Sequence, residues 1–252
     1  MCREHISKSL SRRRVYTTSY RESIVSIAHF HSETINIWSH LVGSLWFLAS
    51  ATRLVGTATT LLSPSVAAIF AYLIANFFCF ACSTLYHVFA DHAEADFWLQ
   101  FDYLGIVCVI WASSTSFIVL ALEGHPGEQY MYTVLITLAA TLCSLRLSNN
   151  LQHSFLERRS RIITYIALGS LAALPALRCW HLGRNFSLVA DFGGMVILNT
   201  LGGAIYATHL LDKTIGLKVG VPDASHHTMH VLAVAGALVY EQGLMSAYQG
   251  FV

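Results

Sequence analysis

The stretch Ser225-His226-His227-Thr228-Met229-His230 opens an apolar run that extends almost to the end of the chain. His226 and His230 are four residues apart, so on a helix their imidazoles lie on one face, one turn apart. Two imidazoles with this spacing can reach one metal ion, and neutral imidazole is the commonest metal-binding side chain. Because the chain holds 13 histidines in 252 residues, such a pair also arises by chance, and it needs support from other residues.

The apolar run that follows this stretch is the last of seven. Hydrophobic residues make up 55% of the chain and charged residues 12%, and the mean hydropathy is +0.55. A helix that crosses a bilayer needs about 20 apolar residues. The runs long enough to do so are 37–56, 65–88, 99–121, 130–147, 162–180, 188–211 and 226–248. The sequence therefore predicts an all-α integral membrane protein, a seven-transmembrane-helix bundle.

The basic residues predict how this bundle is oriented. Residues 1–35 are expected to form a cytoplasmic basic tail and an amphipathic segment at the membrane surface, and residues 36–252 the seven-transmembrane-helix domain. Twelve of the 15 Lys and Arg residues lie at the bundle end that carries the N-terminus. The positive-inside rule then predicts a cytoplasmic N-terminus and, after seven crossings, an extracytosolic C-terminus. We expect a multi-pass protein of the plasma membrane or an endomembrane.

Two other compositional features exclude function classes. The formal net charge of +1 gives no basic surface for nucleic acid. Cys79 and Cys82 form a C-x-x-C pair, but it lies within an apolar run and no second such pair accompanies it. We interpret these cysteines as core residues rather than metal or redox groups.

Further ionisable residues are predicted to lie at the same depth as the histidine pair. Run two ends with His87, one turn after Ser83, and Asp102 lies one turn into run three. The end of run two and the starts of runs three and seven lie on the same side of the membrane, whichever way the chain inserts. His87, Asp102, His226 and His230 therefore belong at one end of the bundle. Ionisable groups inside membrane helices are costly and indicate a functional site.

This set of residues has the chemistry of a zinc centre. Three histidines, His87, His226 and His230, leave a fourth tetrahedral position open, as in catalytic zinc sites. Asp102 could ligate the metal, or hold and deprotonate a bound water. Ser83 could hydrogen-bond a ligand imidazole, Asp102 or a substrate oxygen, and the sequence does not choose among them. We take the three histidines as metal ligands and Asp102 and Ser83 as catalytic candidates.

Each residue taken alone also has a simpler explanation. Ser83 can bond back to its own helix, Asp102 can be favoured by the dipole at a helix start, and His87 can lie at the headgroup level. His40, near the inner end of run one, is expected to make helix-packing hydrogen bonds. The shared depth of the set is what favours the metal site.

At these residues the chain resembles the progestin and adipoQ receptor family, which includes adiponectin receptors and haemolysin III-like proteins. The resemblance covers roughly residues 30–250. Its motifs are His31-Ser32-Glu33-Thr34-Ile35-Asn36-Ile37-Trp38-Ser39-His40-Leu41, Ser83-x-x-x-His87, Asp102-Tyr103-x-Gly105-Ile106 and Ser225-His226-x-x-x-His230. The resemblance implies a cytosolic N-terminus, and zinc held by His87, His226 and His230 with Asp102 nearby. It also implies a ceramidase-like lipid-amide hydrolase activity coupled to receptor signalling.

Two segments depart from the family pattern. Residues 206–213 read Tyr-Ala-Thr-His-Leu-Leu-Asp-Lys, where animal receptors usually have an arginine and a Pro-Glu. The loop 218–224 lacks the usual aromatic residue before the serine. The departures spare the metal site but leave the ligand and coupling partners open. A divergent member tied to lipid or zinc homeostasis fits as well as a hormone receptor.

The sequence thus supports two functions. One is a zinc-dependent hydrolase that takes a lipid amide such as ceramide from the bilayer and releases a fatty acid. The other is a receptor for an extracellular ligand in which zinc is purely structural. A transporter or channel is disfavoured, because no line of polar residues is evident across the bundle. The sequence does not set the oligomeric state.

Overall fold

The computed structural model describes residues 14–58, 60, 63–149, 155–216, 221 and 223–249. Residues 1–13 of the predicted basic tail, and most of the loop 218–224, lie outside these described residues. The elements are α2 (Tyr20–Ser26), α3 (Thr34–Thr57), α4 (Pro64–Val88), α5 (Ala95–Ala121), α6 (Pro126–Asn149), α7 (Phe155–His181), α8 (Phe186–Thr208), the π-helix η1 (Asp212–Gly216) and α10 (Ala224–Gln249). Within the described ranges the one β-type pairing is an isolated bridge between Thr17 and His92.

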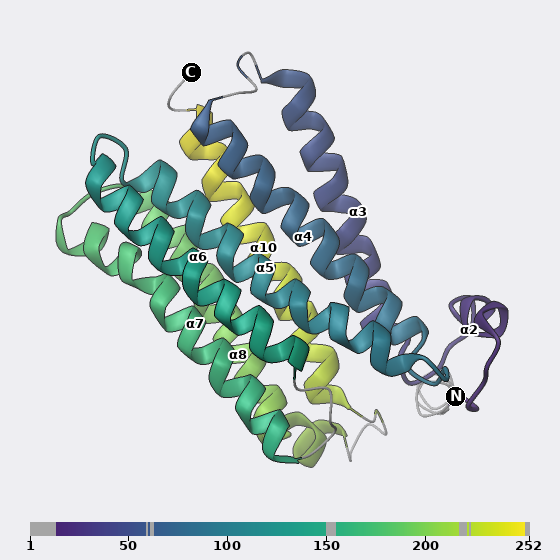
Figure 1. The fold of residues 1–252 in the computed structure, drawn as a ribbon. Helices are drawn as coiled ribbons and strands as arrows, with labels where there is room; N and C mark the ends of the chain where they lie inside the picture. The colour runs from purple at the N-terminus through teal and green to yellow at the C-terminus, as the bar shows by residue number, and fades with distance from the viewer. Residues whose placement is uncertain are drawn as a thin grey trace.

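Seven long helices, α3 to α8 and α10, form the bundle (Figure 1). Each predicted apolar run lies mainly within one of them, which confirms the predicted fold class. Helix α4 packs between α3 and α5, and α10 packs along α8 while also touching α3, α4 and α5. The start of α10 lies beside the end of α4, although the two segments are far apart in the sequence, because the His230 ring contacts the His87 ring.

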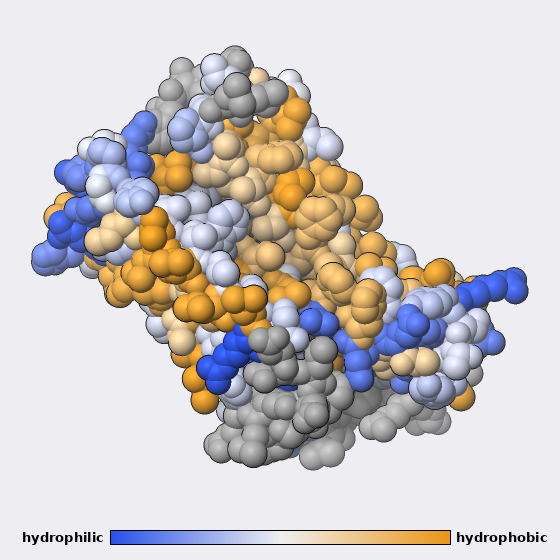
Figure 2. All heavy atoms as spheres, viewed as in Figure 1, coloured by the Kyte–Doolittle hydropathy of each residue, from blue (hydrophilic) through white to orange (hydrophobic). Residues whose placement is uncertain are grey.

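The outer surface of the bundle is that of a membrane protein. Helices α4 to α8 and α10 are long and apolar enough to cross a bilayer. On the face shown in Figure 2, a hydrophobic band occupies the middle of the molecule and hydrophilic side chains gather at its two ends. The chain is therefore a multi-pass integral membrane protein.

Helix α3 is as long as the others but is not among the six apolar spans. The reason is a row of polar side chains along its buried face. Asn36, His40, Ser44 and Ser50 are all at most 6% exposed, so they face the bundle and not the lipid. The polar face of this helix contributes to the interior and lowers its average hydropathy.

Local sequence explains how the helices near the site begin and pack. Ser63 caps α4 by accepting a hydrogen bond from the Val66 amide, and Pro64 follows at the first helical position. Gly105 of α5 lies so close to α4 that an added Cβ would be 3.0 Å from the Cα of Cys79. The missing side chain lets the two helices approach closely just beyond Asp102. Cys79 is buried in this contact, as expected of a core residue.

Aromatic side chains fill the bundle beyond the histidines. The Tyr72 hydroxyl of α4 donates to the Ala237 carbonyl of α10 at 2.7 Å, and its ring meets that of Tyr240 edge-on at 5.0 Å. The Tyr240 hydroxyl donates in turn to the Ser113 carbonyl of α5 at 3.1 Å. These bonds join three helices and satisfy buried hydroxyls in the core.

Candidate metal centre

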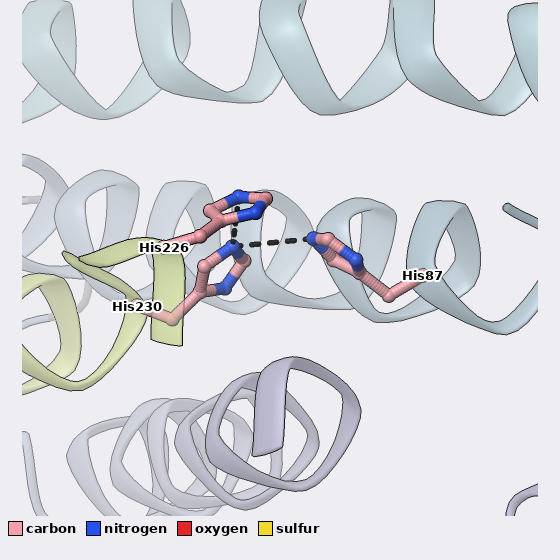
Figure 3. Close-up of side chains that lie close together, drawn as sticks. All are labelled: His87, His226 and His230. Atoms are coloured by element: carbon pink, nitrogen blue, oxygen red, sulfur yellow. Dashed lines mark hydrogen bonds between the residues drawn. The ribbon is translucent and has the colours of Figure 1, made fainter. Parts of the chain in front are cut away.

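Three histidines from two helices converge at one end of the bundle (Figure 3). His87 lies in the last turn of α4, and His226 and His230 lie in the first two turns of α10. The Nε2 atom of His230 is 3.2 Å from Nε2 of His87 and 3.1 Å from Nε2 of His226. One ligand nitrogen from each residue lies within 4.8 Å of the other two. Three of the four residues predicted to share a depth, His87, His226 and His230, thus lie together, while metal binding itself stays a prediction.

Two of the three separations between these nitrogens are those expected around a tetrahedral ion. Two ligands at a Zn–N distance of about 2.0–2.1 Å and tetrahedral angles lie about 3.3 Å apart. The two measured separations are 3.2 and 3.1 Å. His87 and His230 are buried, and a buried cluster of facing imidazole nitrogens is costly without a shared proton or cation between them. The three imidazoles could therefore hold a metal ion, and imidazole nitrogen is a donor that zinc accepts.

Glu33, which precedes α3, orients one of the candidate ligands. Its carboxylate lies 2.8 Å from Nδ1 of His87 and accepts a hydrogen bond from Asn36 at 3.0 Å. Burial alone would raise the pKa of Glu33, but the hydrogen bonds and charge of its neighbours, chiefly His87, outweigh burial and lower the pKa to about 2. An ionised carboxylate only accepts, so Nδ1 of His87 donates and its Nε2 presents a lone pair to the cluster.

His40 supports the cluster from α3. Its Nε2 lies 3.3 Å from the carbonyl oxygen of His230, and the two rings are 4.0 Å apart between centroids. The contact joins α3 to α10, which agrees with the helix-packing role expected for His40. His227 points elsewhere: it contacts the Ser32 carbonyl at 3.0 Å.

The two catalytic candidates lie beside the cluster. Asp102 of α5 interacts electrostatically with His87 and Ser83, but its carboxylate is not in the group of ligand atoms within 4.8 Å. This geometry favours a role next to the metal over direct ligation. Among the described residues, Ser83 Oγ is buried without a hydrogen-bond partner. The back-bond to its own helix is thus not formed, whereas the adjacent Thr84 does donate to the Phe80 carbonyl.

The sequence interpretation missed two residues of the site, Glu33 and Asn36. Both belong to the motif quoted for the family resemblance, but no role was assigned to them. Their three-residue spacing places both on one face at the start of α3, with His40 four residues further on. A polar face at the start of a membrane helix is the signal that would have found them.

The fold and the cluster define a class of protein: a multi-pass helical membrane protein with a histidine site at one end of its bundle. The chain belongs to the haemolysin-III-related family, whose sequence pattern matches residues 28–240. This match confirms the resemblance described above.

Relatives with assigned names cover most of the chain. It is 23% identical to the ADIPOR-like receptor IZH1 of Eremothecium gossypii, over 92% of this chain and 77% of that protein. It is 24% identical to the adiponectin receptor protein of Drosophila melanogaster, over 90% of this chain but only 53% of that protein. It is 26% identical to the human progestin and adipoQ receptor family member 3, over 98% of this chain and 85% of that protein. The chain is thus an adiponectin receptor-like membrane protein.

Proposed function

We propose that this protein is a zinc-dependent lipid amide hydrolase of the ceramidase type, coupled to signalling and lipid metabolism. The observation that carries the proposal is the convergence of three imidazole Nε2 atoms, with one imidazole oriented by a buried carboxylate. An open fourth position at such a set is the arrangement of hydrolytic zinc sites. With the N-terminus in the cytosol, the site lies at the cytoplasmic face.

In this proposal the three histidines, Asp102 and Ser83 have different roles in hydrolysis. Zinc held by His87, His226 and His230 would supply Lewis-acid polarisation and make a nearby water more acidic. Asp102, which neighbours His87 and lies outside the ligand group, would hold that water and accept its proton. The buried hydroxyl of Ser83, which neighbours Asp102, would hydrogen-bond Asp102 or the substrate oxygen.

The surroundings of the site favour a lipid substrate. The helices that carry His87, Asp102 and the α10 pair cross the membrane, and large apolar side chains such as Phe97 and Phe101 are exposed near the start of α5. An apolar surface of this kind would suit a substrate with long alkyl chains that approaches the site from the bilayer. Ceramide, with a fatty acid as product, is the lipid amide we propose.

The first experiment measures metal content. Elemental analysis of detergent-purified wild type should give about one zinc per chain, as expected of a single tetrahedral site. The His226→Ala, His230→Ala double variant should hold almost none. His181→Ala is the matched control, since it removes an exposed histidine at the end of α7. If the wild-type protein is folded, has never been exposed to a chelator and still contains no metal, the zinc-dependent hydrolase mechanism is excluded.

A second function is favoured by the names of the three relatives, all of which contain the word receptor. In that case zinc ties α4 to α10 structurally, and an extracellular ligand changes their packing. Asp102→Asn separates the two functions. A hydrolase loses ceramide turnover in this variant while its zinc content is unchanged. A receptor with structural zinc shows no turnover in the wild type, and its signalling is unaffected by Asp102→Asn.

A further inference from the structure

Arg14, which precedes α2, is bound to the end of the helix that carries His87. Its Nη2 donates to the carbonyl of His87 at 2.7 Å, and its Nη1 donates to the carbonyl of Val88 at 2.7 Å. The same guanidinium forms an ion pair with Asp91 at 3.0 Å and donates to Ser26 Oγ at 3.0 Å. The Arg14 side chain is only 11% exposed, so this is a built site and not a surface contact.

The two carbonyls are ones that the helix itself cannot satisfy. The last carbonyls of an α-helix have no intrahelical partner, and they form the negative end of its dipole. At the end of α4 the Phe89 amide bonds only the carbonyls of Leu85 and Tyr86. A guanidinium supplies both the positive charge and the several donors needed for the next two carbonyls. Arg14 thus fixes where the last turn of α4 ends.

The segment that carries Arg14 is itself attached to the turn after α4. The Thr17 amide donates to the Asp91 carbonyl at 3.0 Å, and the Ala93 amide donates to the Thr17 carbonyl at 3.1 Å. Tyr20 then packs its ring against Phe89, with the centroids 5.0 Å apart. These contacts fasten the segment of residues 14–26, which we call the N-terminal clamp, to the turn after α4 and so hold Arg14 against the end of that helix.

His87 is consequently fixed at two points. Its ring is held through Nδ1 by Glu33, and its backbone is held through the carbonyl by Arg14. The remaining nitrogen, Nε2, is the atom that faces His230. A shift of the last turn of α4 would move this nitrogen, while the α10 histidines stayed on their own helix.

We infer that Arg14 is a positioning residue for the metal ligand His87, and that the N-terminal clamp tunes the affinity of the site for zinc. The inference rests on the proposed function in one respect, that the histidine cluster holds a metal. The inference goes beyond that function by giving a role to the N-terminal clamp, which lies outside the transmembrane helices. Attachment or release of the clamp would change the affinity of the site for the metal.

The test compares Arg14→Gln and Arg14→Lys with Arg21→Gln, which makes the same charge change at an exposed position on α2. Zinc affinity is measured by chelator competition, and the site geometry by the visible spectrum of the cobalt-substituted protein. We expect Arg14→Gln to bind zinc about 10-fold more weakly, with a changed cobalt spectrum, as for other residues that orient a ligand. The zinc affinity of Arg14→Lys should lie between those of Arg14→Gln and the wild type. A lysine keeps the positive charge, but it lacks the planar guanidinium that donates to two carbonyls at once. Arg21→Gln should match the wild type.

The outcomes separate this inference from the proposed function. If wild type binds metal and both Arg14 variants bind it with unchanged affinity and cobalt spectrum, the positioning role is excluded. This holds even if their metal-free thermal stability falls, since that would show a purely structural helix cap. If Arg14→Gln does not fold, the lysine variant decides the question. If the folded wild type binds neither zinc nor cobalt, the proposed zinc-dependent function is excluded, and the positioning role of Arg14 is excluded with it.

Discussion

At the scale of single residues, the site depends on a carboxylate that does not face the open cluster. Glu33 contacts Nδ1 of His87 and is held by Asn36, so it fixes both the orientation and the tautomer of one candidate ligand. Carboxylates in this position raise the basicity of the imidazole they contact. The chemistry of the cluster is therefore set partly by a residue just before α3.

We predict that Glu33→Gln weakens zinc binding about 10-fold, because the amide cannot supply the negative charge that orients the imidazole. The measurement is competition with a chelator of known zinc affinity. Glu123→Gln is the matched control, since Glu123 is exposed in the turn just after α5, at the opposite end of that helix from Asp102. Equal affinities for wild type and Glu33→Gln would show that Glu33 does not orient a metal ligand.

At the scale of helices, the distance between α4 and α5 decides how Asp102 meets His87. Gly105 allows that distance, since an added Cβ would lie 3.0 Å from the backbone of Cys79. Any larger side chain there must push the two helices apart. Helix packing, and not the local sequence at Asp102, sets its separation from the histidines.

We predict that Gly105→Val destabilises the protein by about 1–3 kcal/mol, the usual range for an overpacked core. It should also lower catalytic turnover more than zinc content, because Asp102 moves while the α4 and α10 ligands keep their helices. Thermal unfolding in detergent and the ceramide assay measure the two effects. Gly193→Val is the control, because an added Cβ at Gly193 of α8 meets nothing within 4 Å. Comparable stability losses in both variants would contradict the prediction.

A second helix-scale contact anchors the start of α10 to η1. Ser225 Oγ accepts from the amides of Leu211 and Asp212 at 3.0 and 3.3 Å, and the Ser225 amide donates to the Asp212 carboxylate at 3.1 Å. Burial acts to raise the pKa of Asp212, but hydrogen bonds from Ser225 and His209 outweigh it and lower the pKa below its ordinary value. This carboxylate therefore favours the folded state only when it is ionised.

The sign of the resulting pH dependence follows from linkage. A carboxyl whose pKa is lower in the folded state stabilises the fold fully above its unfolded pKa, and the contribution is lost as the pH falls through the folded pKa. We predict that Asp212→Asn lowers the melting temperature at neutral pH, and that the difference from wild type shrinks below about pH 4. Thermal unfolding across this range measures it. A difference that stays constant with pH would assign the effect to another cause.

At the scale of the whole molecule, the bundle places its candidate site at the end that also carries the N-terminal clamp. The start of α3 and the end of α10 lie at opposite ends of the bundle (Figure 1). The distribution of Lys and Arg predicts that the end with the site faces the cytosol.

We predict that an N-terminal tag is reached by antibody or protease only after the plasma membrane is permeabilised. A C-terminal tag should be reached in intact cells when the protein is at the cell surface. In sealed endomembrane vesicles with the cytosolic face outside, the two results exchange. The opposite pattern would reverse the orientation and place the histidine cluster on the extracytosolic side.

The sequence alone determined the number of long helices, and it determined that His87, Asp102, His226 and His230 lie at the same end of the bundle. Hydropathy and helical periodicity are local properties, and the side on which a residue emerges follows from counting crossings. The i, i+4 spacing likewise placed His226 and His230 on one helix face. These conclusions needed no knowledge of how the helices pack.

The tertiary structure alone decided the rest of the site. It placed Glu33 behind His87, left Asp102 outside the ligand group, and brought Arg14 to the end of α4. Crossings fix the depth of a side chain but not the direction in which it points. That direction depends on how each helix is rotated and how closely it approaches its neighbours, and these are set by packing contacts between residues far apart in the chain.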